Sequence, residues 1–193
     1  MDMQSLEELS LSRFLVPTEL PVFEANLSGL PNVLKSAREA LEELRASHPA
    51  STPSNVRAVY MSPWKSHLLT PKLQPLLDIT ADLIRKISID FFRMDLDGLN
   101  YDLLTADAWC AVYEQADSAI LHSHYPADFS CVAYLDMEPG AAPIIFANAL
   151  EVRPVPGSLL VFPGLLPHHV PATPGRRVVA AMNFIKVPKP LRA

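Results

Sequence analysis

The sequence has little glycine and cysteine, no surplus of positive charge and no long hydrophobic run. Of its 193 residues, six are glycine and two are cysteine, and its formal net charge at pH 7 is -5. A negative chain offers no strong positive field to nucleic acid or to an anionic membrane surface. No apolar run approaches the roughly 20 residues that span a bilayer. We therefore expect no nucleic-acid or membrane partner, and a small-molecule substrate instead.

The two cysteines and the start of the chain indicate the compartment. Cys110 and Cys131 both lie in apolar stretches, which predicts buried free thiols rather than a disulfide. The segment Met1–Ser10 carries acidic residues where a signal peptide carries basic ones. We therefore expect a cytoplasmic protein.

Length and composition predict one globular domain over residues 1–193. Hydrophobic residues make up 49% of the chain and charged residues 19%, far from the composition of a disordered protein. A second independent domain would be cramped at this length. We expect a helical N-terminal part over about 1–95 and a β-barrel over about 96–187.

Hydrophobic periodicity places the secondary structure. Apolar residues recur at helical spacing over 32–46 and over 72–92, which predicts two amphipathic helices. Later in the chain, short apolar or alternating runs bounded by turn residues predict strands at 109–114, 119–124, 130–136, 144–147, 158–163 and 177–186. The dipeptide Pro156-Gly157 predicts a type II turn before one of them. Helices first and strands afterwards predict a mainly β fold, a jelly-roll or cupin-like barrel with N-terminal helices buttressing one face.

Four of the six histidines fall in two tight groups, His122 with His124 and His168 with His169. Side chains alternate along a strand, so His122 and His124 are expected to share a face, whereas only one residue of the second pair can easily reach the same point. His168 follows His124 by 44 residues, far enough for intervening strands to bring the chain back opposite its start. Three protein ligands with open positions suit a catalytic metal, and imidazole binds iron as well as zinc, copper or nickel.

The last predicted strand offers an anion site. Arg177 opens this strand nine residues after His168 and shares a face with Val179, Ala181 and Asn183. A guanidinium inside an apolar barrel needs an anion, and its planar fork fits a carboxylate. The alternative for this arginine is a solvated position in the preceding turn.

An ordered set of motifs extends over about residues 54–185. It comprises Ser54-Asn55, Trp64-Lys-Ser66, Trp109, HSHYP at 122–126, SCVAYL at 130–135, PGSLLVFP at 156–163, His168 with Val170, and RVVAAMN at 177–183. In order and spacing this set resembles a compact branch of the 2-oxoglutarate- and Fe(II)-dependent oxygenases.

The resemblance implies a double-stranded β-helix in which three histidines bind Fe(II) and Arg177 pairs with the distal carboxylate of 2-oxoglutarate. The histidines matching the family pattern are His122, His124 and His168. Such an enzyme uses 2-oxoglutarate and molecular oxygen to hydroxylate its substrate, here expected to be a small metabolite such as an amino acid. Trp109 and Tyr101 are candidates to line the substrate pocket.

The chain departs from the family pattern at two positions. The family more often has a carboxylate two residues after the first histidine, where this chain has His124. Either imidazole replaces the carboxylate or Asp128 supplies it. Many members also have Ser or Thr two residues after the arginine, where this chain has Val179. The side chains that could hold the cosubstrate in its place are Tyr113, Tyr134 and Asn183.

Two other functions stay open at the level of sequence. The three-histidine set favours a cupin-type dioxygenase that takes oxygen without 2-oxoglutarate, and Arg177 argues against it. A β-sandwich that binds a metal or ligand without catalysis is the other alternative. The apolar helices could also support a homodimer.

Overall fold

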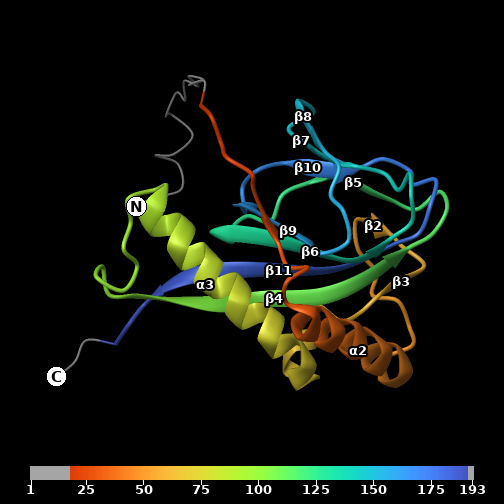
Figure 1. Cartoon of the computed structure of the whole chain (residues 1–193), viewed down its shortest axis with the longest axis horizontal. Coiled ribbons are helices and arrows are strands. Elements are labelled where there is room, and N and C mark those ends of the chain that lie inside the picture. Colours follow the sequence, from red (N-terminus) through yellow and green to blue (C-terminus); the bar gives the residue numbers. More distant parts are fainter. Residues whose placement is uncertain (1–17, 191–193) are drawn as a thin grey trace, which may run out of the picture.

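The computed structural model describes residues 18–190, which form two antiparallel β-sheets with two helices against one of them (Figure 1). The larger sheet has the strand order β1-β9-β6-β11-β4-β3 and the smaller one the order β2-β5-β10-β7-β8. The predicted β-rich architecture with helices on one face is therefore confirmed.

The strands are longest in the larger sheet. That sheet consists of β1 (Phe23–Asn26), β3 (Tyr60–Met61), β4 (Tyr101–Tyr113), β6 (Phe129–Met137), β9 (Ser158–Pro163) and β11 (Arg177–Pro188). The smaller sheet consists of β2 (Val56–Arg57), β5 (Ser118–His122), β7 (Ile144–Phe146), β8 (Leu150–Val152) and β10 (His168–Val170). All six predicted strands are present, although β4 begins eight residues earlier than predicted. Strands β1, β2, β3, β8 and β10 were not predicted, because runs of two to four residues carry too little periodicity.

Both predicted helices are present. Helix α2 (Pro31–Ser47) matches the prediction within a residue at either end, and proline occupies its first position. The second predicted helix divides into a short 3-10 turn, η2 (Pro71–Leu73), followed by α3 (Gln74–Asp90). A further 3-10 turn, η1 (Ser66–Leu68), precedes them.

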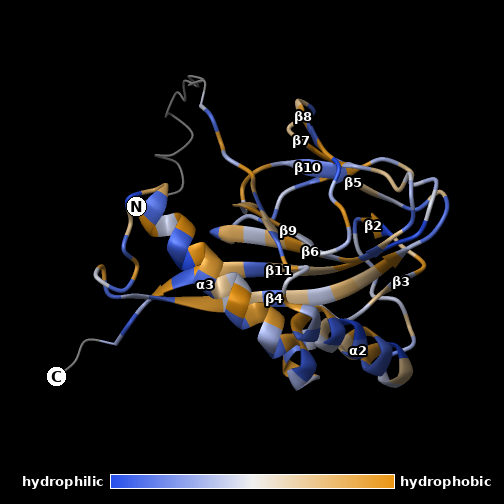
Figure 2. Ribbon diagram, in the orientation of Figure 1, coloured by the Kyte–Doolittle hydropathy of each residue, from blue (hydrophilic) through white to orange (hydrophobic). Residues whose placement is uncertain are grey.

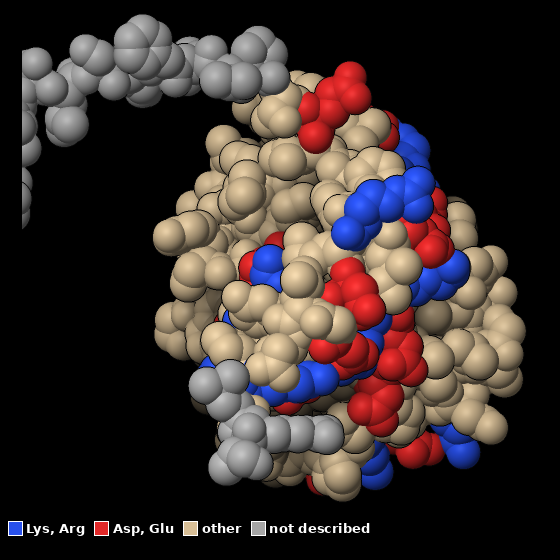
Figure 3. Space-filling model, turned by 90° about the vertical axis from the view of Figure 1, so that its left-hand side faces the viewer, with Lys and Arg blue, Asp and Glu red and all other residues tan. Residues whose placement is uncertain are grey.

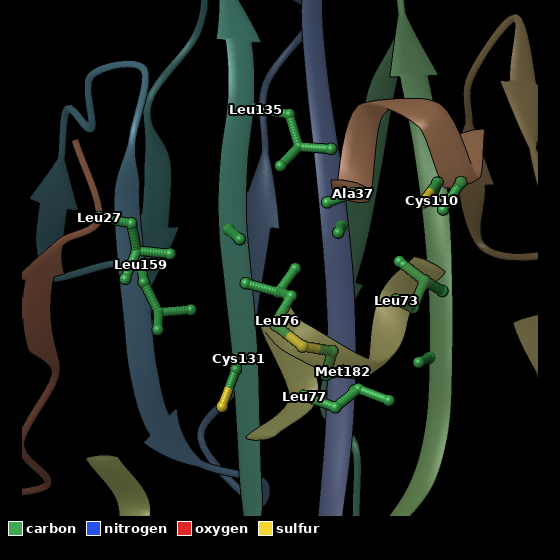
Figure 4. Close-up of a cluster of buried hydrophobic side chains, with 14 of the residues drawn as sticks. Leu27, Ala37, Leu73, Leu76, Leu77, Cys110, Cys131, Leu135, Leu159 and Met182 are labelled. Atoms are coloured by element: carbon green, nitrogen blue, oxygen red, sulfur yellow. The ribbon is translucent and has the colours of Figure 1, made fainter. Parts of the chain in front are cut away.

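The helices pack on the outer face of the larger sheet. On β11, the side chains of Val178, Ala180 and Met182 belong to the same buried cluster as Leu76 and Leu77 of α3. Figure 4 shows side chains of the helices and the sheet meeting in this layer. Figure 2 shows hydrophobic and hydrophilic residues alternating around both helices, as expected for helices with one buried face. The opposite face of β11 is left to line the space between the two sheets.

A second core lies between the sheets. Its largest side chains include Tyr134 and Phe162 from the larger sheet and Phe146 from the smaller one. The rings of Phe146 and Phe162 meet edge to face, with centroids 4.9 Å apart. This core fills one part of the interior and leaves a cavity beside it, which holds the candidate site.

The turn before β9 has the predicted form. The Ser158 backbone N–H donates to the carbonyl of Val155 at 2.9 Å, and Gly157 has φ +92°. Proline in the first corner position and glycine with positive φ in the second define a type II turn. The turn directs β9 into the larger sheet.

The structure also tests some of the predictions about the cysteines, membrane helices and surface charge. Cys110 and Cys131 are buried free thiols, as predicted. Within residues 18–190 no helix is long and apolar enough to cross a membrane. The face drawn in Figure 3 mixes basic and acidic side chains instead of collecting one sign. The predicted absence of a signal peptide concerns Met1–Ser10, which lies outside the described residues.

Candidate metal and anion site

Three histidines that are distant in sequence come together between the sheets. One ligand atom from each of His122, His124 and His168 lies within 4.8 Å of the others. The ring centroids are 4.4 to 5.2 Å apart. Three imidazoles at this separation can bind one metal ion, with open positions left for other ligands.

A β-bulge aims His122 into the cavity. His168 lies opposite His122, and Val170 lies opposite Ala119, so two steps along β10 correspond to three steps along β5. The extra residue breaks the alternation of side chains, and both Ala119 and His122 line the cavity. Ile120 and Leu121 are exposed as a result. The prediction of a regular strand over 119–124 is therefore wrong for its last part, since β5 ends at His122.

His124 lies in the loop after β5, so its position does not depend on strand alternation. Its backbone N–H donates to the carbonyl of Gly164 at 2.7 Å, and the N–H of Gly164 donates to the carbonyl of Asp128 at 3.0 Å. These two bonds hold the loop against the chain after β9. A Cβ atom at position 164 would lie 2.2 Å from the carbonyl oxygen of Ala127, so only glycine allows this approach. Sequence analysis missed Gly164, and the only signal was a glycine directly after a strand.

Replacing Gly164 by alanine is expected to weaken metal binding at the cluster by about 10-fold or more. The new methyl group must displace the loop that carries His124, and ligand positions are sensitive to shifts of this size. The metal dissociation constant can be measured by competition with a chelator. Gly29→Ala is the matched control, because a Cβ there meets no atom within 4 Å. Equal metal affinity in both variants would contradict the assignment.

Hydrogen bonds to carbonyl oxygens set the tautomer of two rings. His122 Nδ1 lies 2.6 Å from the carbonyl oxygen of Ile120, and His168 Nδ1 lies 3.0 Å from that of Leu166. A carbonyl oxygen only accepts, so each Nδ1 carries the proton. The Nε2 atom of each ring then has a free lone pair for a metal ion.

Burial keeps the three imidazoles neutral at physiological pH. Burial and, to a smaller extent, the neighbouring imidazoles His168 and His122 together lower the pKa of His124 to about 3. Burial also lowers the pKa of His168 to about 4, against an opposing effect of the Leu166 carbonyl. The pKa of His122 is lowered by burial as well. Neutral imidazole is the form that binds metals, so protons do not compete at pH 7.

The metal-free protein is expected to lose stability as the pH falls from about 6.5 to about 4. In this window the unfolded chain protonates His168 while the folded chain does not, so the free energy of unfolding decreases. Between about pH 7.5 and pH 5 this histidine alone contributes roughly 2 kcal/mol. Denaturant unfolding with a chelator present measures the slope. His168→Gln should flatten it. A slope in this variant equal to that of the wild type would refute the assignment.

Arg177 is buried in the same cavity without a carboxylate partner. Its side chain is 2% exposed, and its Nε and Nη1 atoms have no hydrogen-bond partner. Its Cζ atom lies 4.1 Å from the centroid of the Tyr113 ring, which partly compensates the charge. An unpaired buried guanidinium is costly, so a site of this kind is built for an anion. The alternative of a solvated turn position does not hold for Arg177.

The cavity joins the histidines to Arg177. Besides these four side chains its lining is mainly apolar and aromatic, consisting of Val56, Trp109, Tyr113, Ala119, Val132, Tyr134, Ile144, Val170, Val179 and Ala181. Burial raises the pKa of both Tyr113 and Tyr134, which keeps their hydroxyl groups protonated and able to donate. Both tyrosines thus line the same cavity as Arg177 with hydroxyl groups that can donate a hydrogen bond.

Two of the predicted polar residues lie elsewhere. Asn183 accepts a hydrogen bond from Ser130 Oγ at 2.8 Å, and its Nδ2 lies 3.5 Å from His124 Nδ1. It therefore adjoins a histidine of the cluster and not Arg177. Asp128 accepts from the backbone N–H of Lys186 at 2.6 Å and pairs with the ammonium of that residue at 3.1 Å. Because this carboxylate is outside the cluster, the alternative of Asp128 as the third ligand is not supported.

Of the two aromatic residues predicted to line the substrate pocket, only Trp109 lies at the cavity. The ring of Trp109 lines the cavity and lies 5.7 Å from that of His124. Tyr101 is at the opposite end of β4, opposite Pro188, whereas Tyr113 lies opposite Arg177. Twelve residues of strand span roughly 40 Å. The prediction of Tyr101 in the substrate pocket is therefore wrong, because β4 extends to Tyr101 and carries it to the end of the strand away from the cavity.

Comparison with known proteins identifies the fold. No family model and no curated protein matches the sequence. A prolyl-4-hydroxylase from Pseudomonas putida is similar in structure, with a TM-score of 0.61 and 18% identity over 85% of this chain and 91% of that chain. The non-heme alpha-ketoglutarate-dependent carbocyclase SnoK of nogalamycin biosynthesis has a TM-score of 0.64 and 12% identity, over 89% and 83% of the two chains. HygX from Streptomyces hygroscopicus, with nickel and 2-oxoglutarate bound, has a TM-score of 0.56 and 13% identity, over 84% and 81%. The predicted double-stranded β-helix, the fold of these oxygenases, is confirmed.

Proposed function

We propose that this protein is an Fe(II)- and 2-oxoglutarate-dependent oxygenase. In this proposal His122, His124 and His168 hold the metal, and Arg177 binds the distal carboxylate of 2-oxoglutarate. The observation that carries it is the buried guanidinium of Arg177, whose Nε and Nη1 lack partners and which shares one cavity with the histidine cluster. A structural neighbour, HygX, has nickel and 2-oxoglutarate bound.

The residues of the chain fit both groups. Three neutral imidazoles are suitable ligands for Fe(II), and they leave positions for a bidentate cosubstrate and for oxygen. The fork of Arg177 can donate two parallel hydrogen bonds to one carboxylate. Tyr113 and Tyr134 flank it, and Val179 keeps this part of the lining apolar. Water is thereby excluded from the anion, which strengthens its attraction to the guanidinium.

The protein positions the reactants, and the bound groups supply the oxidation. Bound Fe(II) and 2-oxoglutarate would provide the oxidising power for hydroxylation by molecular oxygen. The apolar lining limits side reactions by excluding water, and Trp109 beside His124 restricts the approach of the substrate. The free space inside the cavity is only about 40 Å³. The substrate proposed for this protein is a small metabolite such as an amino acid.

The test is an anaerobic titration of the Fe(II)-loaded protein with 2-oxoglutarate. Chelation of Fe(II) by a 2-oxo acid produces a visible charge-transfer band, which we expect to appear and to saturate. Pyruvate, which lacks the distal carboxylate, should bind at least about 10-fold more weakly, because it cannot reach Arg177. A band of equal affinity with both acids would contradict the role of Arg177.

Assays of oxygen consumption and succinate formation, run alongside this titration, separate the alternatives. A three-histidine dioxygenase that does not use 2-oxoglutarate would show no band, yet would consume oxygen with its own substrate. A non-catalytic metal site would retain zinc in a closed coordination and form no succinate under any condition. Either result would overturn the proposal.

A further inference from the structure

A groove on the surface adjoins the histidine cluster. His124 lines both the cavity and this groove. The groove has about 430 Å³ of free space, against about 40 Å³ in the cavity. A molecule that reaches the cluster from solvent therefore has room for most of its atoms in the groove and not in the cavity.

The groove continues the cavity along the two central strands of the larger sheet. On β11, Arg177 and Ala181 line the cavity, whereas Asn183 and Ile185 line the groove. On β4, Asp107 lines the groove and lies opposite Asn183. Because alternate residues of a strand share a face, the groove and the Arg177 end of the cavity lie at opposite ends of one continuous surface.

Two aromatic side chains from distant segments line the groove. The ring of Trp64 meets that of Trp109 edge to face, with centroids 4.8 Å apart, and the Trp64 carbonyl accepts from the backbone N–H of Ala108 at 2.9 Å. Tyr125, in the loop after β5, is 80% exposed. The groove therefore combines one aromatic ring that is held in place with one that is free to contact a ligand.

The groove has a single carboxylate. Among the described residues that line it, Asp107 carries the only permanent charge. One oxygen of Asp107 pairs with the Lys65 ammonium at 3.1 Å, and the other accepts from the Asn183 amide at 3.4 Å. The ion pair is weak, because the side chain of Lys65 is 57% exposed. A carboxylate has about four acceptor positions, so Asp107 can also accept from an ammonium group of a ligand.

We propose that this groove is the substrate site and that it selects a substrate with a positively charged amine. Asp107 would bind the ammonium group, and the rings of Trp64 and Tyr125 would contact it through their faces. Small amines and amino acids with a basic side chain have this chemistry. The inference rests on the proposed function, since it names the class of molecule that the oxygenase oxidises. The groove itself consists only of residues of the chain.

The test compares two probes of nearly equal size, phenethylamine and its neutral counterpart 2-phenylethanol. Each is titrated into the full-length protein while the NMR signal of the Trp64 indole N–H is followed. Loss of this signal in Trp64→Phe assigns it. We expect phenethylamine to bind about 5-fold more tightly than the alcohol, because only the amine is attracted to Asp107. Equal affinity of the two probes would overturn the inference.

Variants of the ion pair should change the affinity in opposite directions. Asp107→Asn keeps the size of the side chain and should weaken phenethylamine binding about 5-fold without affecting the alcohol. Lys65→Met removes the partner of Asp107 and should tighten binding of the amine. Asp97→Asn is the matched control, because Asp97 pairs with Lys189 outside the groove, and its amine affinity should equal that of the wild type. Unchanged amine affinity in Asp107→Asn would contradict the assignment.

A second measurement tests whether the bound amine lies beside the histidine cluster. Co(II) is paramagnetic, so Co(II)-loaded protein should broaden the NMR signals of phenethylamine, whereas Zn(II)-loaded protein should not. An amine that binds without this broadening would refute the substrate role of the groove. A protein that forms the visible band with Fe(II) and 2-oxoglutarate but does not prefer the amine refutes this inference alone. A protein that prefers the amine but forms no band refutes the proposed function, and with it the substrate role of the groove.

Discussion

Replacing His168 by alanine is expected to abolish metal binding at the cluster and, with it, the visible band formed with 2-oxoglutarate. His168 is 4% exposed, and its ring is held by the carbonyl of Leu166, so its Nε2 is directed for ligation at little entropic cost. Removing even a hydrogen-bond partner of a metal ligand typically lowers metal affinity about 10- to 100-fold. Loss of a ligand should therefore raise the metal dissociation constant by more than about 100-fold, as measured by competition with a chelator.

The neighbouring histidine provides the control for this experiment. His169 lies opposite Ile145 of β7 and is not part of the cluster. His169→Gln should bind metal as the wild type does. If His168→Ala keeps its metal affinity, or if His169→Gln loses it equally, the ligand set is wrong.

Replacing Arg177 by methionine is expected to raise the dissociation constant of 2-oxoglutarate by at least about 100-fold while leaving metal affinity unchanged. Each hydrogen bond to a charged group contributes about 1.5 to 3 kcal/mol, and two such bonds are lost. The stability of the metal-free protein should not fall, because the substitution removes a buried charge whose Nε and Nη1 have no partners. Band titration and denaturant unfolding measure the two quantities.

Arg176 is the matched control for Arg177. It is the adjacent residue and has the same side chain, but it pairs with Glu114 and Asp136 at the surface. Arg176→Met should bind 2-oxoglutarate with wild-type affinity. An Arg177→Met protein that forms the band at wild-type concentrations of 2-oxoglutarate would remove the main support for the proposed cosubstrate.

The elements that could be predicted from the sequence are those in which apolar residues recur at a regular spacing. Helix α2 and the strands β6, β9 and β11 were predicted within two residues at each end, because their apolar residues recur regularly. The short strand β10 was not predicted, although it carries His168. Its three residues form a strand only because β5 and β7 flank them, and that pairing is a long-range contact.

The site shows the same division between local and long-range information. His122, His124, His168 and Arg177 were selected from sequence, because their spacing matches a known pattern and imidazole and guanidinium groups are scarce inside apolar segments. The reason given for joining His122 and His124 was wrong, since only His122 lies on a strand. A bulge aims His122 inward, and backbone bonds to Gly164 hold His124. The bulge has no signature in neighbouring residues, and the only sign of the second feature is a glycine directly after a strand.

The sequence by itself determined the two helices, the strands β6, β9 and β11, the buried thiols and the four side chains of the candidate site. These depend on hydrophobic periodicity and on side-chain chemistry, both of which can be recognised from residues that are neighbours in the sequence. Only the tertiary structure decided that Asp128 forms an ion pair with Lys186 and that Tyr101 lies far from Arg177. It also decided that no carboxylate lines the cavity. The physical reason is that hydrogen bonding and charge compensation between distant segments depend on strand register, and register is settled only when the sheets pack.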